Sequence, residues 1–186
     1  MTDTTTIDVP GYKAGTWVLD PAHSEVGFVV RHMMISKVRG HFDIKSATLT
    51  APENPLEASL TAQVDATSLS TKDEGRDAHL RSADFFDVEN YPTIDFVSTG
   101  VRIEKGEFLV DGDLTIHGTT KPVTFDVDFG GFGSDPWGNY KAGATAKTVI
   151  NREDFGLTWN AALETGGVLV GKDVTIELDL QGAHQA

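Results

Sequence analysis

The stretch Leu56–Asp65, LEASLTAQVD, places apolar and polar side chains in strict alternation. Every second position is apolar, and these positions are Leu56, Ala58, Leu60, Ala62 and Val64. Successive side chains of an extended chain point to opposite faces, so the pattern predicts a β-strand with one buried and one wet face. Strands of a buried parallel sheet are apolar on both faces, and the stretch therefore favours an antiparallel sheet.

The same alternation recurs along most of the chain. It is present in Ser24–His32, Ile94–Ser98, Phe108–Ile116, Val123–Phe129, Tyr140–Ile150 and Val174–Leu180. Turns at Lys105-Gly106 and His117-Gly118 join neighbouring strands, and Gly130–Asn139 predicts a glycine-rich loop. About eight such strands predict an all-β fold, and closing them into an antiparallel barrel leaves no free sheet edge.

One segment departs from the alternation. Thr71 and Glu74 fit a capping box, in which two side chains satisfy the free amides at the start of a helix. Helical spacing then places Arg76 and His79 on one face, so residues 72–83 predict a short helix between the middle strands. A face with both polar and apolar side chains is typical of a helix that closes the end of a barrel or gates its side.

The chain ends and two internal irregularities are also expected from the sequence. We expect disorder over residues 1–13, which lack any pattern. We expect one domain over residues 14–182 and a tail over residues 183–186. Gly40 predicts a bulge or bend, and the alternation slips near Ala47 and Leu49 as it does at a bulge.

Composition excludes several classes of function. The 186-residue chain has no Cys, which excludes disulfides and thiolate metal sites. Its formal net charge of -13 would repel nucleic acids and anionic headgroups, so nucleic acid is not an expected partner. No apolar run is long enough for stable membrane insertion. The first ten residues show no signal peptide, and the expected location is cytoplasmic.

Small side chains on one predicted strand point to a hollow interior. Ala142, Ala144 and Ala146 share the face opposite Lys141 and Lys147, so the inner wall carries methyl groups there. An eight-stranded barrel is near the size at which side chains either fill the interior or leave room for one ligand. Alanines favour a cavity of roughly a few hundred Å³. The alternative is that phenylalanines of other strands fill this space.

A long, apolar cavity suits a long-chain lipid better than a compact ligand, because each buried methylene contributes about 0.8 kcal/mol. The candidate polar contacts at the rim are His32, Arg76 and His79. The candidate apolar contacts are the inward residues of the strands and the two phenylalanines after the helix. They are Val26, Phe28, Val30, Phe42, Leu60, Ala62, Val64, Phe85, Phe86, Phe96, Leu114, Phe125, Ala142, Ala144 and Ala146.

Two enzymatic alternatives can be written from the sequence. A hydrolase would combine Ser24, His79 and Asp77, but no nucleophile elbow surrounds Ser24. A metal centre would use histidines, yet no pair of histidines has the short spacing that sets two ligands side by side. We therefore expect no catalytic residue, no metal and no cofactor. Arg76 and Asp77 are expected to form a structural ion-pair network that holds the helix.

Several segments together identify a resemblance. The sequence resembles the YceI-like polyisoprenoid-binding proteins through Trp17–Ser24, Phe28–His32, Val38–Phe42, Arg76–Leu80, Ala83–Asp87, Tyr91-Pro92, Gly112–Gly118 and Arg152 with Asp154–Gly156. These segments follow the expected order from about Thr16 to Leu180.

The resemblance implies a lipocalin-like barrel that holds an isoprenoid or another long-chain amphiphile in its lumen, without catalytic residues. A polyisoprenoid or isoprenoid quinone is the expected ligand, and a fatty acid or fatty amide is the alternative. Family members often pair, so a homodimer is a further expectation. Many relatives carry an export signal, which is not visible here.

Overall fold

The computed structural model describes residues 7–163 and 167–185. These residues form nine β-strands, one α-helix and three short 3-10 helices. The strands are β1 (Gly15–Leu19), β2 (Glu25–His32), β3 (Ser36–Ala51), β4 (Ser59–Ser70), β5 (Thr93–Glu104), β6 (Glu107–Ile116), β7 (Thr119–Ser134), β8 (Tyr140–Asn151) and β9 (Val170–Gln185). The helices are α1 (Glu74–Arg81), η1 (Pro21–His23), η2 (Pro55–Glu57) and η3 (Arg152–Phe155).

The strands close into an antiparallel barrel. Both β1 and β2 pair with β3 and with β9, so these two short strands follow one another in a single position of the wall. Pairing of β3 with β4 completes the ring. Nine strands therefore occupy eight positions, which confirms the predicted all-β, antiparallel barrel with one short helix.

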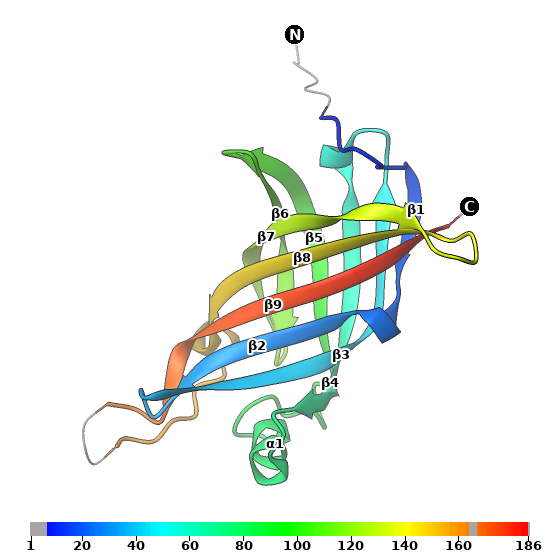
Figure 1. The fold of residues 1–186 in the computed structure, drawn as a ribbon. Helices are drawn as coiled ribbons and strands as arrows, with labels where there is room; N and C mark the ends of the chain where they lie inside the picture. The colour runs from blue at the N-terminus through cyan, green and yellow to red at the C-terminus, as the bar shows by residue number, and fades with distance from the viewer. Residues whose placement is uncertain (1–6, 164–166, 186) are drawn as a thin grey trace.

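The connections divide the barrel into two ends (Figure 1). The helix end carries α1, η3 and the β2–β3 and β6–β7 turns. The N-terminal end carries the segment before β1, η2 and the β5–β6 and β7–β8 turns. In the part of the chain that the structure describes, no helix is both long and apolar enough to cross a bilayer.

Two predicted hairpin turns are confirmed. Lys105 and Gly106 have φ angles of 52° and 81°, and His117 and Gly118 have φ angles of 53° and 72°. Two successive residues in the left-handed region make the turn whose twist matches that of the flanking strands. Glycine adopts this region without a steric penalty, which explains why the sequence revealed both turns.

The bulges predicted at Gly40 and near Ala47 do not lie at these positions. Gly40 is in register with Phe28, and a Cβ at Gly40 would lie 2.3 Å from the Phe28 ring, so the glycine gives this ring its space. The register of β3 against β4 shifts between His41 and Asp43 and between Ile44 and Ser46, a few residues before the expected slip.

Three predicted boundaries need correction. β7 continues through Ser134 after a bulge next to Gly131, so the loop expected over 130–139 is shorter. β9 extends to Gln185 because Ala183–Gln185 pair with β1, and the expected tail at 183–186 is strand as far as it is described. Residues 1–6 of the segment predicted to be disordered lie outside the described residues. The following residues have defined contacts, because the Tyr12 hydroxyl donates to the Pro52 carbonyl at 2.6 Å.

The start of α1 also differs from the prediction. Asp73 is the N-cap, and its carboxylate accepts from the Arg76 amide at 3.0 Å. Thr71 instead binds the buried Asp77, to which it donates from its amide at 2.8 Å and from its hydroxyl at 2.5 Å. The capping-box prediction was wrong because two competing acceptors follow Thr71 in the sequence. The Asp77 carboxylate holds the end of β4 against the helix.

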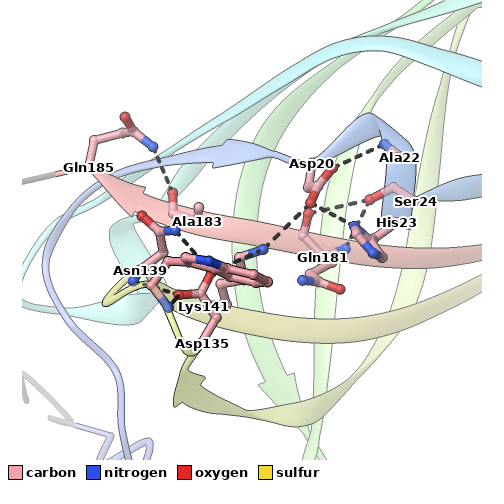
Figure 2. A network of polar contacts seen from close by, with 11 residues as sticks. Asp20, Ala22, His23, Ser24, Asp135, Asn139, Lys141, Gln181, Ala183 and Gln185 are labelled. Atoms are coloured by element: carbon pink, nitrogen blue, oxygen red, sulfur yellow. Dashed lines mark hydrogen bonds and ion pairs between the residues drawn. The ribbon is translucent and has the colours of Figure 1, made fainter.

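A polar network fixes the corner between β1 and β2 at the N-terminal end (Figure 2). The Asp20 carboxylate lies 2.8 Å from His23 Nδ1 and accepts from the Ala22 amide at 3.0 Å. Lys141 Nζ lies 3.6 Å from Asp20 and 3.6 Å from Asp135, so it links this corner to the β7–β8 turn. The network holds together chain segments that are distant in the sequence.

Acidification is expected to weaken this corner. The hydrogen bond with His23 holds the pKa of Asp20 below its ordinary value of 3.8, and the hydrogen bond with Asn139 does the same for the pKa of Asp135. Such carboxylates stabilise the fold above their unfolded pKa, and that contribution is lost as the pH falls through the folded value. We expect the urea midpoint of unfolding to fall when the pH is lowered below about 4. This fall should be smaller in the Asp20→Asn variant. Equal decreases in urea titrations of the two proteins would contradict this prediction.

Candidate functional site

Cross-strand pairing determines which side chains line the barrel. Ala146 and Phe125 are buried, and directly paired residues of neighbouring strands project to the same side. Leu178 lies opposite both Ala146 and Val26, and Phe42 lies opposite Val26. The same argument applies around the whole ring and extends along each strand. It places on the inner face Val26, Phe28, Val30, Phe42, Leu60, Ala62, Val64, Phe96, Leu114, Phe125, Ala142, Ala144 and Ala146.

The inner face is solid toward the helix end. Leu69 is 0% exposed at the end of β4, and Phe155 of η3 is 1% exposed. Phe42, Phe96, Leu114, Phe125 and Ala146 belong to the same buried cluster. Side chains from the connections thus fill this half of the barrel, and α1 caps a filled end rather than an open one.

On β4, β7 and β8, exposure of the inner face rises toward the N-terminal end. Along β7 it rises from 7% at Phe125 to 42% at Phe129, although both side chains share the inner face. On β8, Ala146 is buried whereas Ala144 and Ala142 are half-buried. On β4 the burial follows the same direction, from half-buried Leu60 and Ala62 to buried Leu69. Inner apolar side chains that solvent still reaches indicate that this half is hollow.

A cavity of about 1220 Å³ lies along β2, β7, β8 and β9. Its lining includes the inner-face residues Phe28, Phe108, Val127, Phe129, Ala146 and Leu178. It also includes residues of the opposite face, such as Lys147, Glu177 and Asp179. Part of this volume therefore lies outside the wall.

The segment before β1 crosses the N-terminal end of the barrel. The Tyr140 hydroxyl donates to the Gly11 carbonyl, and the Trp17 indole donates to the Lys13 carbonyl at 3.0 Å. Lys13 Nζ lies 4.0 Å from the centroid of the Tyr140 ring. The Trp17 ring packs edge-on against Phe132 at 5.9 Å, so aromatic side chains and the crossing backbone partly cover the hollow half. Asp8, Val9 and Pro10 belong to the cavity lining.

The predicted polar contacts are engaged with the protein itself. Arg76 donates from Nε to the Thr71 hydroxyl at 2.8 Å and from Nη2 to the Thr71 carbonyl at 2.9 Å. Arg76 and Asp77 thus converge on Thr71, and among the described residues they form no direct ion pair with each other. This corrects the expected ion-pair network, because each group has a closer partner in Thr71.

His79 and the aromatic residues around it form a second cluster at the helix end. Its Nε2 atom lies 2.9 Å from Asp84, and its ring packs edge-on against Trp159 at 4.6 Å and against Phe85 at 5.2 Å. Phe86 packs against Phe42 at 5.4 Å and so belongs to the filled core. His32 is half-buried at the end of β2, far along the wall from the hollow half.

The residues of the two enzymatic alternatives do not come together. Ser24 exchanges hydrogen bonds with the Gln181 backbone next to η1, whereas Asp77 and His79 lie on α1 at the other end of the barrel. Among residues 7–163 and 167–185, no three His, Asp or Glu side chains group in a way that could hold a metal ion.

Arg152 plays a larger structural role than its sequence context suggested. It is 3% exposed and donates to the carbonyls of Gly171, Leu157, Trp159 and Val170. Burial lowers the pKa of its guanidinium, and nearby Glu153 opposes this shift. Arg152 therefore holds the long connection from η3 to β9 against the filled end.

Comparison with known proteins identifies the family. A family model described as the YceI-like domain matches residues 17–182. The chain belongs to the YceI-like family. A UPF0312 protein of Staphylococcus aureus strain MSSA476 is 42% identical over 163 residues, which cover 87% of this chain and 93% of the relative.

Two solved structures share the fold of this chain. Burkholderia cenocepacia BcnA superposes with a TM-score of 0.75 at 25% identity, covering 88% of this chain and 98% of BcnA. A polyisoprenoid-binding domain from Saccharophagus degradans has a TM-score of 0.63 at 15% identity and covers 91% of this chain and 98% of that domain. The second likeness concerns the fold alone. The family model and the Staphylococcus aureus relative together confirm the family that the sequence resembles.

Sequence reasoning missed the aromatic residues at the two ends. Phe132 lies in the segment that the sequence predicts to be a glycine-rich loop, and Trp159 lies outside every predicted strand. Both were visible as aromatic residues beside strand ends, yet no periodic pattern includes them. Trp17 begins a segment that carries the family resemblance, and only its hydrogen bond to the crossing segment shows its place at the mouth.

Proposed function

We propose that this protein is a non-enzymatic carrier that holds a long-chain apolar or amphiphilic lipid, namely a polyisoprenoid or an isoprenoid quinone, in the hollow half of its barrel. The observation that carries the proposal is the rise in exposure of inner apolar side chains from Phe125 to Phe129 and from Ala146 to Ala142. An apolar wall open to solvent is unfavourable when empty, and an apolar ligand would cover it.

Several features favour a long ligand. The inner face of the hollow half offers apolar side chains such as Leu60, Val127 and Leu178. Between Val127 and Ala142, no charged side chain of β7 or β8 points inward. About ten buried methylenes would contribute about 8 kcal/mol, which corresponds to roughly micromolar affinity without a strong polar anchor. We therefore place the tail between Ala144 and Phe129, and the head near the crossing segment at Lys13. A fatty acid or fatty amide is the alternative ligand with the same tail chemistry.

Native mass spectrometry of the purified protein, followed by organic extraction, tests this proposal. We expect an adduct with the mass of one lipid, and we expect the extract to contain that lipid. Protein stripped by unfolding and refolding should bind an added polyisoprenol or quinone. Protein that purifies empty and binds none of the polyisoprenol, quinone or fatty-acid probes would contradict the carrier function.

A further inference from the structure

The β2–β3 turn presents an exposed apolar surface at the helix end. Met33, Met34 and Ile35 are 41%, 58% and 81% exposed, and Val168 beside them is 37% exposed. The Met33 amide donates to the Leu169 carbonyl at 2.7 Å, so the turn and the segment before β9 form one projection. Figure 1 shows both segments together at the far end of β2 and β3. We call Met33, Met34, Ile35 and Val168 the apolar tip.

Methionine is an unfavourable residue for the backbone conformation of this turn. Met33 and Met34 have φ angles of 53° and 59°, and the Ile35 amide donates to the His32 carbonyl at 3.3 Å. This hydrogen bond closes a β-turn with Met33 and Met34 at its centre, inside the three-residue loop between the paired His32 and Ser36. A β-turn with positive φ angles at both central positions favours Asn, Asp and Gly there. Two large apolar side chains are strained in this region of φ. Such strain indicates that the side chains serve a purpose other than forming the turn.

The strands that carry the tip are locally basic in an acidic protein. Val26–Phe42 contains no Asp or Glu, although the chain has 28 acidic residues. Exposed Arg31 lies directly opposite exposed Lys37, an arrangement of like charges that destabilises a strand pair. Arg39, which lies on β3 together with Lys37, is also exposed. Within the described chain, none of these three cations takes part in an ion pair.

We propose that the apolar tip docks the protein reversibly on a membrane surface that contains anionic lipids. The tip side chains enter the interfacial region, and Arg31, Lys37 and Arg39 contact the headgroups. The net charge of -13 does not prevent this contact, because charges beyond about 8 to 10 Å are largely screened at physiological salt. The membrane would supply both the apolar partner and the anions that the tip lacks.

A second copy of the chain fits the tip less well. A symmetric contact between two tips would bring two sets of Arg31, Lys37 and Arg39 together, and these like charges would repel one another. An anionic bilayer has no such conflict. It also explains why cations flank the apolar residues instead of the acids that dominate elsewhere in the chain.

Vesicle co-sedimentation of the full chain tests this proposal. We expect binding to vesicles of phosphatidylcholine with phosphatidylglycerol, weaker binding to phosphatidylcholine alone, and weaker binding at high salt. The triple variant Arg31→Gln, Lys37→Gln, Arg39→Gln should bind on the order of a hundredfold more weakly to the anionic vesicles. Trp137→Ser removes an 84% exposed indole from the β7–β8 turn at the other end, and it should bind like the unmodified protein.

A turn variant separates docking from folding. Met33→Asn with Met34→Gly gives the turn its preferred residues, so thermal melting should show equal or higher stability while vesicle binding decreases. Equal vesicle binding by the turn variant and the unmodified protein would overturn the proposal. So would absence of binding to anionic vesicles at low salt, or a tip-dependent dimer in light scattering that forms without vesicles. Ala144→Trp, which narrows the lumen, should not affect docking, so the result does not depend on the proposed lipid cargo.

Discussion

Replacing Arg152 with alanine is expected to lower the free energy of unfolding by about 3 to 5 kcal/mol. The side chain is 3% exposed and donates to four backbone carbonyls. Alanine would leave these carbonyls without their donor, and each buried unpaired carbonyl costs about 1 to 3 kcal/mol before water enters. Two of these carbonyls, of Leu157 and Trp159, lie in the connection after η3, and the other two, of Val170 and Gly171, lie at the start of β9. We therefore expect the filled end of the barrel to loosen.

Urea denaturation followed by circular dichroism measures this effect, and Arg102→Ala is its matched control. Arg102 is exposed and pairs with Asp111 and Glu104, so its loss should change the unfolding free energy by less than about 1 kcal/mol. Arg152→Lys should recover little of the stability, because a single ammonium cannot reproduce the planar fork of the guanidinium. A loss below about 1 kcal/mol for Arg152→Ala would show that water readily replaces the side chain.

The fold could be predicted because its signals are local. A period of two residues identifies a strand, and a glycine in a two-residue turn identifies the hairpin that joins it to the next. Leu60, Ala62 and Val64 follow this rule, and so do the turns at Lys105 and His117. Closure then followed from the number of strands. The inner face was predicted from the same alternation, and pairing in the structure places those residues inside.

The depth of a residue along the barrel could not be predicted from alternation. Phe96 and Phe129 are both phenylalanines on the inner face, yet their exposed fractions are 9% and 42%. They differ because the end of β4, η3 and the segment after η3 bring Leu69, Phe155 and Leu157 into one half of the barrel. Those closing residues are distant in the sequence from the strands they cover, so no local pattern records the contact.

The crossing segment was missed for a related reason. Gly11 and Lys13 contribute backbone carbonyls, and the partners that recognise them are side chains of Tyr140 and Trp17. A carbonyl has no sequence signature, so the segment predicted only disorder. At α1 the capping-box pattern pointed to Thr71, but the buried Asp77 carboxylate binds Thr71 and Asp73 caps the helix instead.

Replacing Ala144 with tryptophan is expected to lower lipid occupancy at least about tenfold while leaving the fold intact. Ala144 lies opposite Phe129 and Leu180, in the half where inner side chains are still exposed. An indole placed there would occupy the space of several methylenes of the ligand. Because the space is hollow, the side chain should fit without displacing its neighbours, and the urea midpoint should change little.

Thr145→Trp is the matched control, because it adds the same indole to the exposed outer face of the same strand. The control should retain the lipid that Ala144→Trp loses, as native mass spectrometry would show. A solid interior would give the opposite result for Ala144→Trp: overpacking would cost about 1 to 3 kcal/mol of stability, and no lipid would be present to lose. Measuring occupancy and urea midpoint on the same two variants therefore distinguishes a carrier with a hollow half from a barrel with a filled core.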